Sequence, residues 1–179
     1  TIGDANIAIG RNALYTANDE DADHNIVIGY EAGKVLDGAD ANGNVILGSY
    51  ALSSVAGGAK ENIVIGRDAM ELCTATTNDK NVVIGTNALD TSSVDTTGSI
   101  VIGNYNTVMG WQAGYGMTSG SNNVAIGSNA MYSAVTTDAQ VAIGQNAGYS
   151  LTDGAGNNLV GYRAGYSLTT GSANIYIGY

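Results

Sequence analysis

Three aspartates near the start of the chain alternate as in a calcium-binding loop: Asp19, Asp21 and Asp23. An EF-hand loop also needs glycine at its sixth position and a bidentate glutamate at its twelfth, where this chain has His24 and Tyr30. We therefore favour a solvated acidic loop over a metal site, and we expect no cofactor. No motif places a serine or cysteine nucleophile beside His24, the single histidine, so we expect no enzyme.

Aromatic residues recur at a constant interval in the C-terminal half. Four tyrosines are equally spaced along the sequence, with a tryptophan nearby: Tyr115, Tyr132, Tyr149 and Tyr166, and Trp111. Such a strip, if exposed, is able to stack on glycan rings or on a receptor surface. A ladder of rings that stiffens the molecule explains the same column, and we favour the ladder over binding.

These residues are positioned by a five-residue phrase that recurs along the whole chain, clearest as Asn-Ile-Val-Ile-Gly at 25–29. Its terminal glycines are seventeen to nineteen positions apart, except for Gly103 and Gly110, which are seven apart. Such short periods and β-branched triplets favour the coils of a β-solenoid. We expect an all-β fold, a parallel β-solenoid (β-roll) of about ten coils, with asparagine amides laddered between coils and glycines at corners.

Alternation within the triplet separates two faces. The first and third residues point to one side and the middle residue to the other, and nearly all of them are apolar. Because one thin coil encloses only one face, we expect the middle residues to form an association surface for a homo-oligomer. The members of this predicted interface include Val27, Ile46, Val64, Val83 and Val101.

Each glycine is followed by a second leg with its own pattern. Alanine stands three residues on, and leucine, methionine or glycine comes next. This spacing fits either a short strand with a bend or a single helical turn. Cys73 occupies a small apolar position of this leg, so we expect a buried, inert thiol.

The chain is organised as one repeat array over residues 1–179. We distinguish acidic 18–19-residue coils at 1–96, an inserted half-coil that shifts the phase at 97–117, and neutral, tyrosine-rich 17-residue coils at 118–179. The net charge of −10 is not typical of proteins that bind nucleic acid or anionic membranes. No apolar run is long enough to cross a bilayer. Because repeats run to both ends, we expect a piece of a longer array.

Two segments resemble repeats of known fibres. Residues 123–127 and 99–110 resemble the head repeats of YadA-type trimeric adhesins, including the seven-residue glycine spacing. Residues 143–152 are similar to repeats of phage tail fibres. The resemblance implies a parallel β-roll, a homotrimer around a threefold axis and attachment to a cell surface.

Our leading hypothesis is a non-enzymatic segment of a trimeric extracellular attachment fibre of the phage tail-fibre type, located on a virion tail or a cell surface. Its partners would be two further copies of itself and a host surface glycan or receptor. Alternatives are the head of a bacterial trimeric autotransporter adhesin and a self-assembling extracellular filament without a receptor. A polysaccharide depolymerase is disfavoured because no paired carboxylates recur at a defined site.

Overall fold

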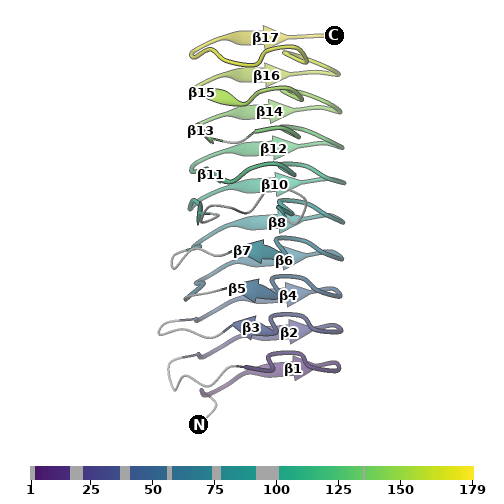
Figure 1. Ribbon diagram of the computed structural model, residues 1–179, viewed down its shortest axis with the longest axis vertical. Helices are drawn as coiled ribbons and strands as arrows, with labels where there is room; N and C mark the ends of the chain where they lie inside the picture. The colour runs from purple at the N-terminus through teal and green to yellow at the C-terminus, as the bar shows by residue number, and fades with distance from the viewer. Residues whose placement is uncertain are drawn as a thin grey trace.

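The computed structural model describes residues 3–16, 22–36, 41–55, 58–73, 78–91, 101–134 and 136–179. These residues form short parallel strands and turns, with no helix among them. Within the same ranges, no helix is long and apolar enough to span a membrane. The strands stack as successive coils along one axis, with the termini at opposite ends (Figure 1). The predicted all-β parallel solenoid is confirmed.

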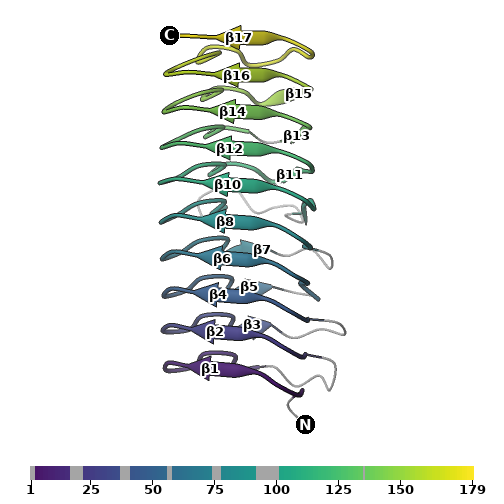
Figure 2. The same ribbon diagram turned by 180° about the vertical axis from the view of Figure 1, so that it is seen from behind.

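The repeated phrase forms one strand of a ten-stranded sheet in each coil. Both views show these strands stacked one above another (Figures 1 and 2). Each strand pairs in register with the next, so that Val27 lies between Ala8 and Ile46. Nine steps of about 4.8 Å make the sheet about 43 Å long. Its strands, in order, are β1 (Ile7–Ile9), β2 (Ile26–Ile28), β4 (Val45–Leu47), β6 (Ile63–Ile65), β8 (Val82–Ile84), β10 (Thr107–Met109), β12 (Val124–Ile126), β14 (Val141–Ile143), β16 (Asn158–Val160) and β17 (Ile175–Ile177).

The second leg of the coil carries two smaller sheets. In the acidic coils, a three-stranded sheet contains β3 (Val35–Leu36), β5 (Ser54–Val55) and β7 (Leu72–Cys73). Further on, a four-stranded sheet contains β9 (Val101–Ile102), β11 (Ser119–Gly120), β13 (Thr136–Asp138) and β15 (Asp153–Ala155). The segment after the corner glycine is a turn without helix, and in the acidic coils it leads into the two-residue strands β3, β5 and β7. Of the two alternatives that the sequence left open, the structure therefore has the short strand with a bend and not the single helical turn. The Cys73 side chain lies outside the described part of the structure.

The irregular stretch at 97–117 divides between two sheets. Its first phrase contributes β9 to the four-stranded sheet, whereas its second contributes β10 to the ten-stranded sheet. Thr107 of β10 pairs with Val82 on one side and with Val124 on the other. The inserted phrase is therefore placed in the second leg, and the register of the main sheet continues through it. Residues 97–100 are not among those described.

The interior of the coil is formed by the middle residue of the phrase, except in the terminal strands β1 and β17, and by the second-leg apolar residues. Val27, Ile46, Val64 and Val83 are fully buried inside their own chain. Our prediction that these side chains form an intermolecular surface is therefore wrong. The fifth predicted residue, Val101, has a side chain outside the described part, and its strand belongs to the four-stranded sheet.

The middle residues face inward, and not outward as predicted, for a simple physical reason. In a strand, residues two apart point to the same side, so the middle residue shares its side with the asparagine two positions earlier. That asparagine is inside: Asn25, like Val27, is fully buried. A buried amide needs hydrogen-bond partners, which the neighbouring coils supply through their own asparagines. With Asn25 inside, this parity places Val27 inside as well.

The predicted amide ladder is confirmed. The Asn25 side-chain oxygen accepts from both the backbone N–H and the side-chain amide of Asn44, each at 2.9 Å, and the Asn25 amide donates to the Ala41 carbonyl at 2.7 Å. The column continues from coil to coil: Asn6, Asn25, Asn44, Asn62, Asn81, Asn106, Asn123, Gln140, Asn157 and Asn174.

The corner glycines are also required, for two reasons. Gly66 has a φ of +139°, which disfavours any side chain. A Cβ at Gly66 would lie 2.4 Å from the carbonyl oxygen of Gly85 in the next coil. The phrase-ending glycine therefore supplies both a positive φ and room for the neighbouring backbone, as predicted.

Candidate functional site

The first and third residues of each phrase form the outside of the ten-stranded sheet. We call these twenty side chains the outer aliphatic face, and all but Thr107 and Asn158 are aliphatic or methionine. None carries a charge. Its members are Ile7, Ile9, Ile26, Ile28, Val45, Leu47, Ile63, Ile65, Val82, Ile84, Thr107, Met109, Val124, Ile126, Val141, Ile143, Asn158, Val160, Ile175 and Ile177.

This face is accessible to solvent in the single chain. Ile26 and Ile63, in the interior of the sheet, are 38% and 39% exposed, while the intervening Val27 and Val64 are fully buried. The outer residues of every strand are exposed or partly exposed, which makes a continuous stripe about 43 Å long. Scattered exposed aliphatic residues are ordinary, but a continuous apolar stripe of this kind is unusual on a protein surface.

Short polar side chains just before the strands of the ten-stranded sheet form a second column of hydrogen-bond acceptors. Sequence reasoning missed this column. The Asp79 carboxylate accepts from the Lys60 backbone N–H at 3.0 Å, and the Asn104 side chain accepts from the Asp79 N–H at 2.8 Å. Asp138 caps the Ser121 N–H at 2.7 Å in the same way. The sequence signal for this column was a short polar residue two positions before most residues of the amide ladder. Short polar side chains of this type accept hydrogen bonds from nearby backbone N–H groups.

The proposed acidic loop is partly described. Asp23 belongs to the capping column, because its carboxylate accepts from the Asp4 N–H and its own N–H donates to Asn42 at 2.7 Å. Asp19 and Asp21 lie outside the described residues. Within the described ranges, no group of three or more histidine, cysteine or acidic side chains is arranged to hold a metal ion.

The equally spaced tyrosines are stacked face to face. We call Tyr115, Tyr132, Tyr149 and Tyr166 the tyrosine column. Successive ring centroids are 5.1, 4.9 and 5.0 Å apart, and the ring planes differ by 9°, 2° and 14°. Partial burial, together with Tyr149 and Tyr115, raises the pKa of Tyr132. Because each ring covers its neighbour, the column presents ring edges and hydroxyl groups along its length.

The fifth predicted aromatic residue lies elsewhere in the coil. Trp111 follows the corner glycine Gly110 directly and is 52% exposed. Its backbone carbonyl accepts from the Asn129 N–H at 2.9 Å, so the tryptophan belongs to the turn that leaves the sheet. The structure thus brings the four tyrosines together as one column and places Trp111 at a separate position of the coil.

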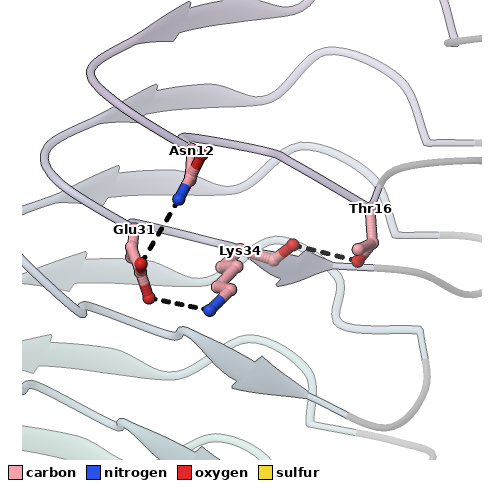
Figure 3. A network of polar contacts seen from close by, with 4 residues as sticks. All are labelled: Asn12, Thr16, Glu31 and Lys34. Atoms are coloured by element: carbon pink, nitrogen blue, oxygen red, sulfur yellow. Dashed lines mark hydrogen bonds and ion pairs between the residues drawn. The ribbon is translucent and has the colours of Figure 1, made fainter.

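The corner of the second coil carries a polar network (Figure 3). The Glu31 carboxylate accepts from the Lys34 ammonium at 2.8 Å and from the Asn12 amide at 3.3 Å. The hydrogen bond from Lys34 lowers the pKa of Glu31. Thr16 donates to the Lys34 carbonyl at 2.9 Å, which ties the first coil to the second. These contacts explain the charged residues here as structural links between coils.

No protein-family model matches the chain, and neither a curated protein nor a solved structure does so.

Proposed function

We propose that this chain is a non-enzymatic structural segment of a homotrimeric extracellular attachment fibre of the phage tail-fibre type. The observation that supports this proposal is the outer aliphatic face, eighteen apolar side chains on ten strands that one chain leaves in contact with water. Two further copies of the same chain are suitable occupants, because the face has the same composition and the same spacing on every copy.

Several properties favour copies of the chain over an unrelated partner. The face carries no charge with which to select a different protein, and its side chains repeat with the period of the coil. Parallel copies in register would place equivalent strands at equal heights along the whole length. Removing this apolar surface from water is favourable by about 25 cal/mol per Å². The number three comes from the resemblance to the repeats of trimeric fibres.

The test is the mass of the assembly in solution. Sedimentation equilibrium of the purified chain, of 18.1 kDa, should give three times that mass. A double variant, Ile63→Asp with Ile84→Asp, places charges on the outer aliphatic face and should give monomers that keep their β-type circular dichroism. The matched control, Thr86→Asp with Gln145→Asp, adds the same charges at the corners and should remain trimeric. A wild-type monomer, or an aspartate double variant that stays assembled, would contradict the proposal.

Attachment to a host surface is the second part of the proposal. Trp111 and the edges of the tyrosine column are available for contact with a glycan or receptor, and a trimer would present each of them three times. Binding to host cells should fall in Trp111→Ala and in the double variant Tyr132→Ala with Tyr149→Ala. Binding that persists in both variants would remove these residues from the site.

One observation favours a second candidate, a shaft that carries no receptor site. Glycan stacking uses the face of an aromatic ring, and in the column the ring faces are covered by neighbouring tyrosines. A shaft predicts assembly as a trimer with no measurable binding to cells or glycans. The same binding experiment therefore distinguishes the two candidates.

A further inference from the structure

The tyrosine column places phenol rings in an arrangement suited to a covalent reaction. Three successive pairs have centroids within 5.1 Å and planes within 14° of parallel. The phenol rings of neighbouring coils are therefore stacked on one another at each step.

The backbone holds these rings in place. The Tyr132 carbonyl accepts from the Gly116 N–H at 2.8 Å, and the Tyr149 carbonyl accepts from the Ser133 N–H at 3.0 Å. The Tyr166 carbonyl accepts from the Ser150 N–H at 3.2 Å. Each of these tyrosines is thus fixed to the coil before it, so the spacing of the rings follows the spacing of the coils.

The column is also accessible to an oxidant. Tyr166 is 36% exposed, and Tyr115, Tyr132 and Tyr149 are partly exposed. We propose that the tyrosine column is a site of oxidative cross-linking, in which neighbouring tyrosines of one chain are joined as dityrosine. The product is a covalent link between successive coils along the axis of the solenoid.

The reaction requires a peroxidase-type oxidant with hydrogen peroxide. Each of two phenols loses one electron and one proton and becomes a tyrosyl radical, whose unpaired electron is shared with the Cε carbons. The two radicals form one Cε–Cε bond, and the ring hydrogens at that bond move to the oxygens and restore both phenols. In total, two ring C–H bonds are lost, one C–C bond forms, and one hydrogen peroxide is reduced to two waters.

Other tyrosine pairs in the described residues have different geometry. Tyr30 and Tyr50 are 5.2 Å apart with planes at 79°, and Tyr162 and Tyr179 are 5.4 Å apart with planes at 40°. Neither pair continues into a stack. In the column, by contrast, Tyr132 and Tyr149 each have a stacked partner on both sides, so a radical on either one has two neighbours with which to couple.

The experiment treats the full chain with a haem peroxidase and limiting hydrogen peroxide over a range of protein concentrations. Dityrosine fluorescence measures the yield, and mass spectrometry identifies joined peptides that lack two hydrogens. We expect links between column tyrosines of successive coils, with a yield per chain that does not depend on protein concentration. On a denaturing gel these products should migrate as single chains, because the link lies within one chain.

Two variants remove every adjacent phenol pair of the column while keeping the rings: Tyr132→Phe with Tyr149→Phe, and Tyr115→Phe with Tyr149→Phe. Both should lose the intrachain links between coils. The control Tyr30→Phe with Tyr50→Phe should retain them. The proposal is overturned if either column variant with wild-type circular dichroism keeps the wild-type yield of these links. It is equally overturned if oxidation of the wild type joins only separate chains or only tyrosines outside the column.

Discussion

The side-chain oxygen of Asn44 accepts two hydrogen bonds from Asn62, one from its backbone N–H and one from its side-chain amide, both at 3.0 Å. Asn62 repeats the arrangement toward Asn81, accepting from that residue's N–H at 2.9 Å, and donates to the Asn78 carbonyl at 2.6 Å. The Asn62 side chain therefore satisfies backbone groups of both Asn78 and Asn81. Because the bond from a backbone N–H to a side-chain oxygen recurs from coil to coil, the ladder is a continuous link along the interior.

Replacing Asn62 with alanine should destabilise the chain by about 2–4 kcal/mol, because the Asn81 N–H and the Asn78 carbonyl lose buried partners. The matched control is Asn62→Gln, since the chain itself uses glutamine at the equivalent Gln140. Urea unfolding followed by circular dichroism measures both. An alanine variant as stable as the glutamine variant would show that the amide is dispensable.

Two glycines with positive φ should respond differently to alanine. At Gly66, a Cβ would lie 2.4 Å from the Gly85 carbonyl oxygen, whereas at Gly156, with φ of +70°, it meets nothing within 4 Å. We expect Gly156→Ala to cost about 1 kcal/mol from backbone strain alone. Gly66→Ala should cost considerably more or prevent folding, because backbone atoms must move apart. Equal unfolding midpoints for the two variants would contradict the close packing at the corner.

Neighbouring residues of β6 test which face is inside. Val64→Asp buries a carboxylate in the core and should cost several kcal/mol, enough to lose the β-type circular dichroism. Ile63→Asp, one residue earlier on the exposed side, should keep that signal in dilute solution. Folding of the Val64 variant together with unfolding of the Ile63 variant would reverse the assignment of faces.

Two glutamates should affect the pH dependence of stability in opposite directions. The hydrogen bond from Lys34 lowers the Glu31 pKa below its ordinary 4.5, so this stabilisation exists above 4.5 and is lost as the pH falls through the lowered value. Burial, with Asp90 and Asp68 nearby, raises the Glu71 pKa above 4.5. The ionised Glu71 therefore destabilises the fold at neutral pH, and protonation removes the penalty.

Thermal unfolding measures both effects. At neutral pH, Glu31→Gln should lower the melting temperature and Glu71→Gln should raise it. In acid, well below the ordinary pKa of 4.5, both differences from wild type should shrink. Each variant is the control for the other, because both remove one carboxylate from an acidic chain. Shifts of the same sign at neutral pH would be incompatible with the two environments.

The architecture of this protein can be predicted from its repeat pattern alone. A short and nearly constant period, a β-branched triplet, a preceding asparagine and a closing glycine together predict stacked parallel strands with an amide ladder and tight corners. These features follow from local chemistry: a buried amide needs partners in the next coil, and a corner that touches the next backbone has no room for a side chain. The stacking of the tyrosines follows from the same period.

Which side of the phrase faces inward becomes clear only when the coil is closed. Alternation shows that Ile26 and Ile28 share one side and Val27 takes the other, but it does not say which side the second leg closes. Both sides are apolar, so hydrophobicity alone leaves the choice open. The coil closes over the side that carries Asn25, because its amide is satisfied only between stacked coils. Val27 is thereby enclosed, and the two isoleucines form the outer aliphatic face.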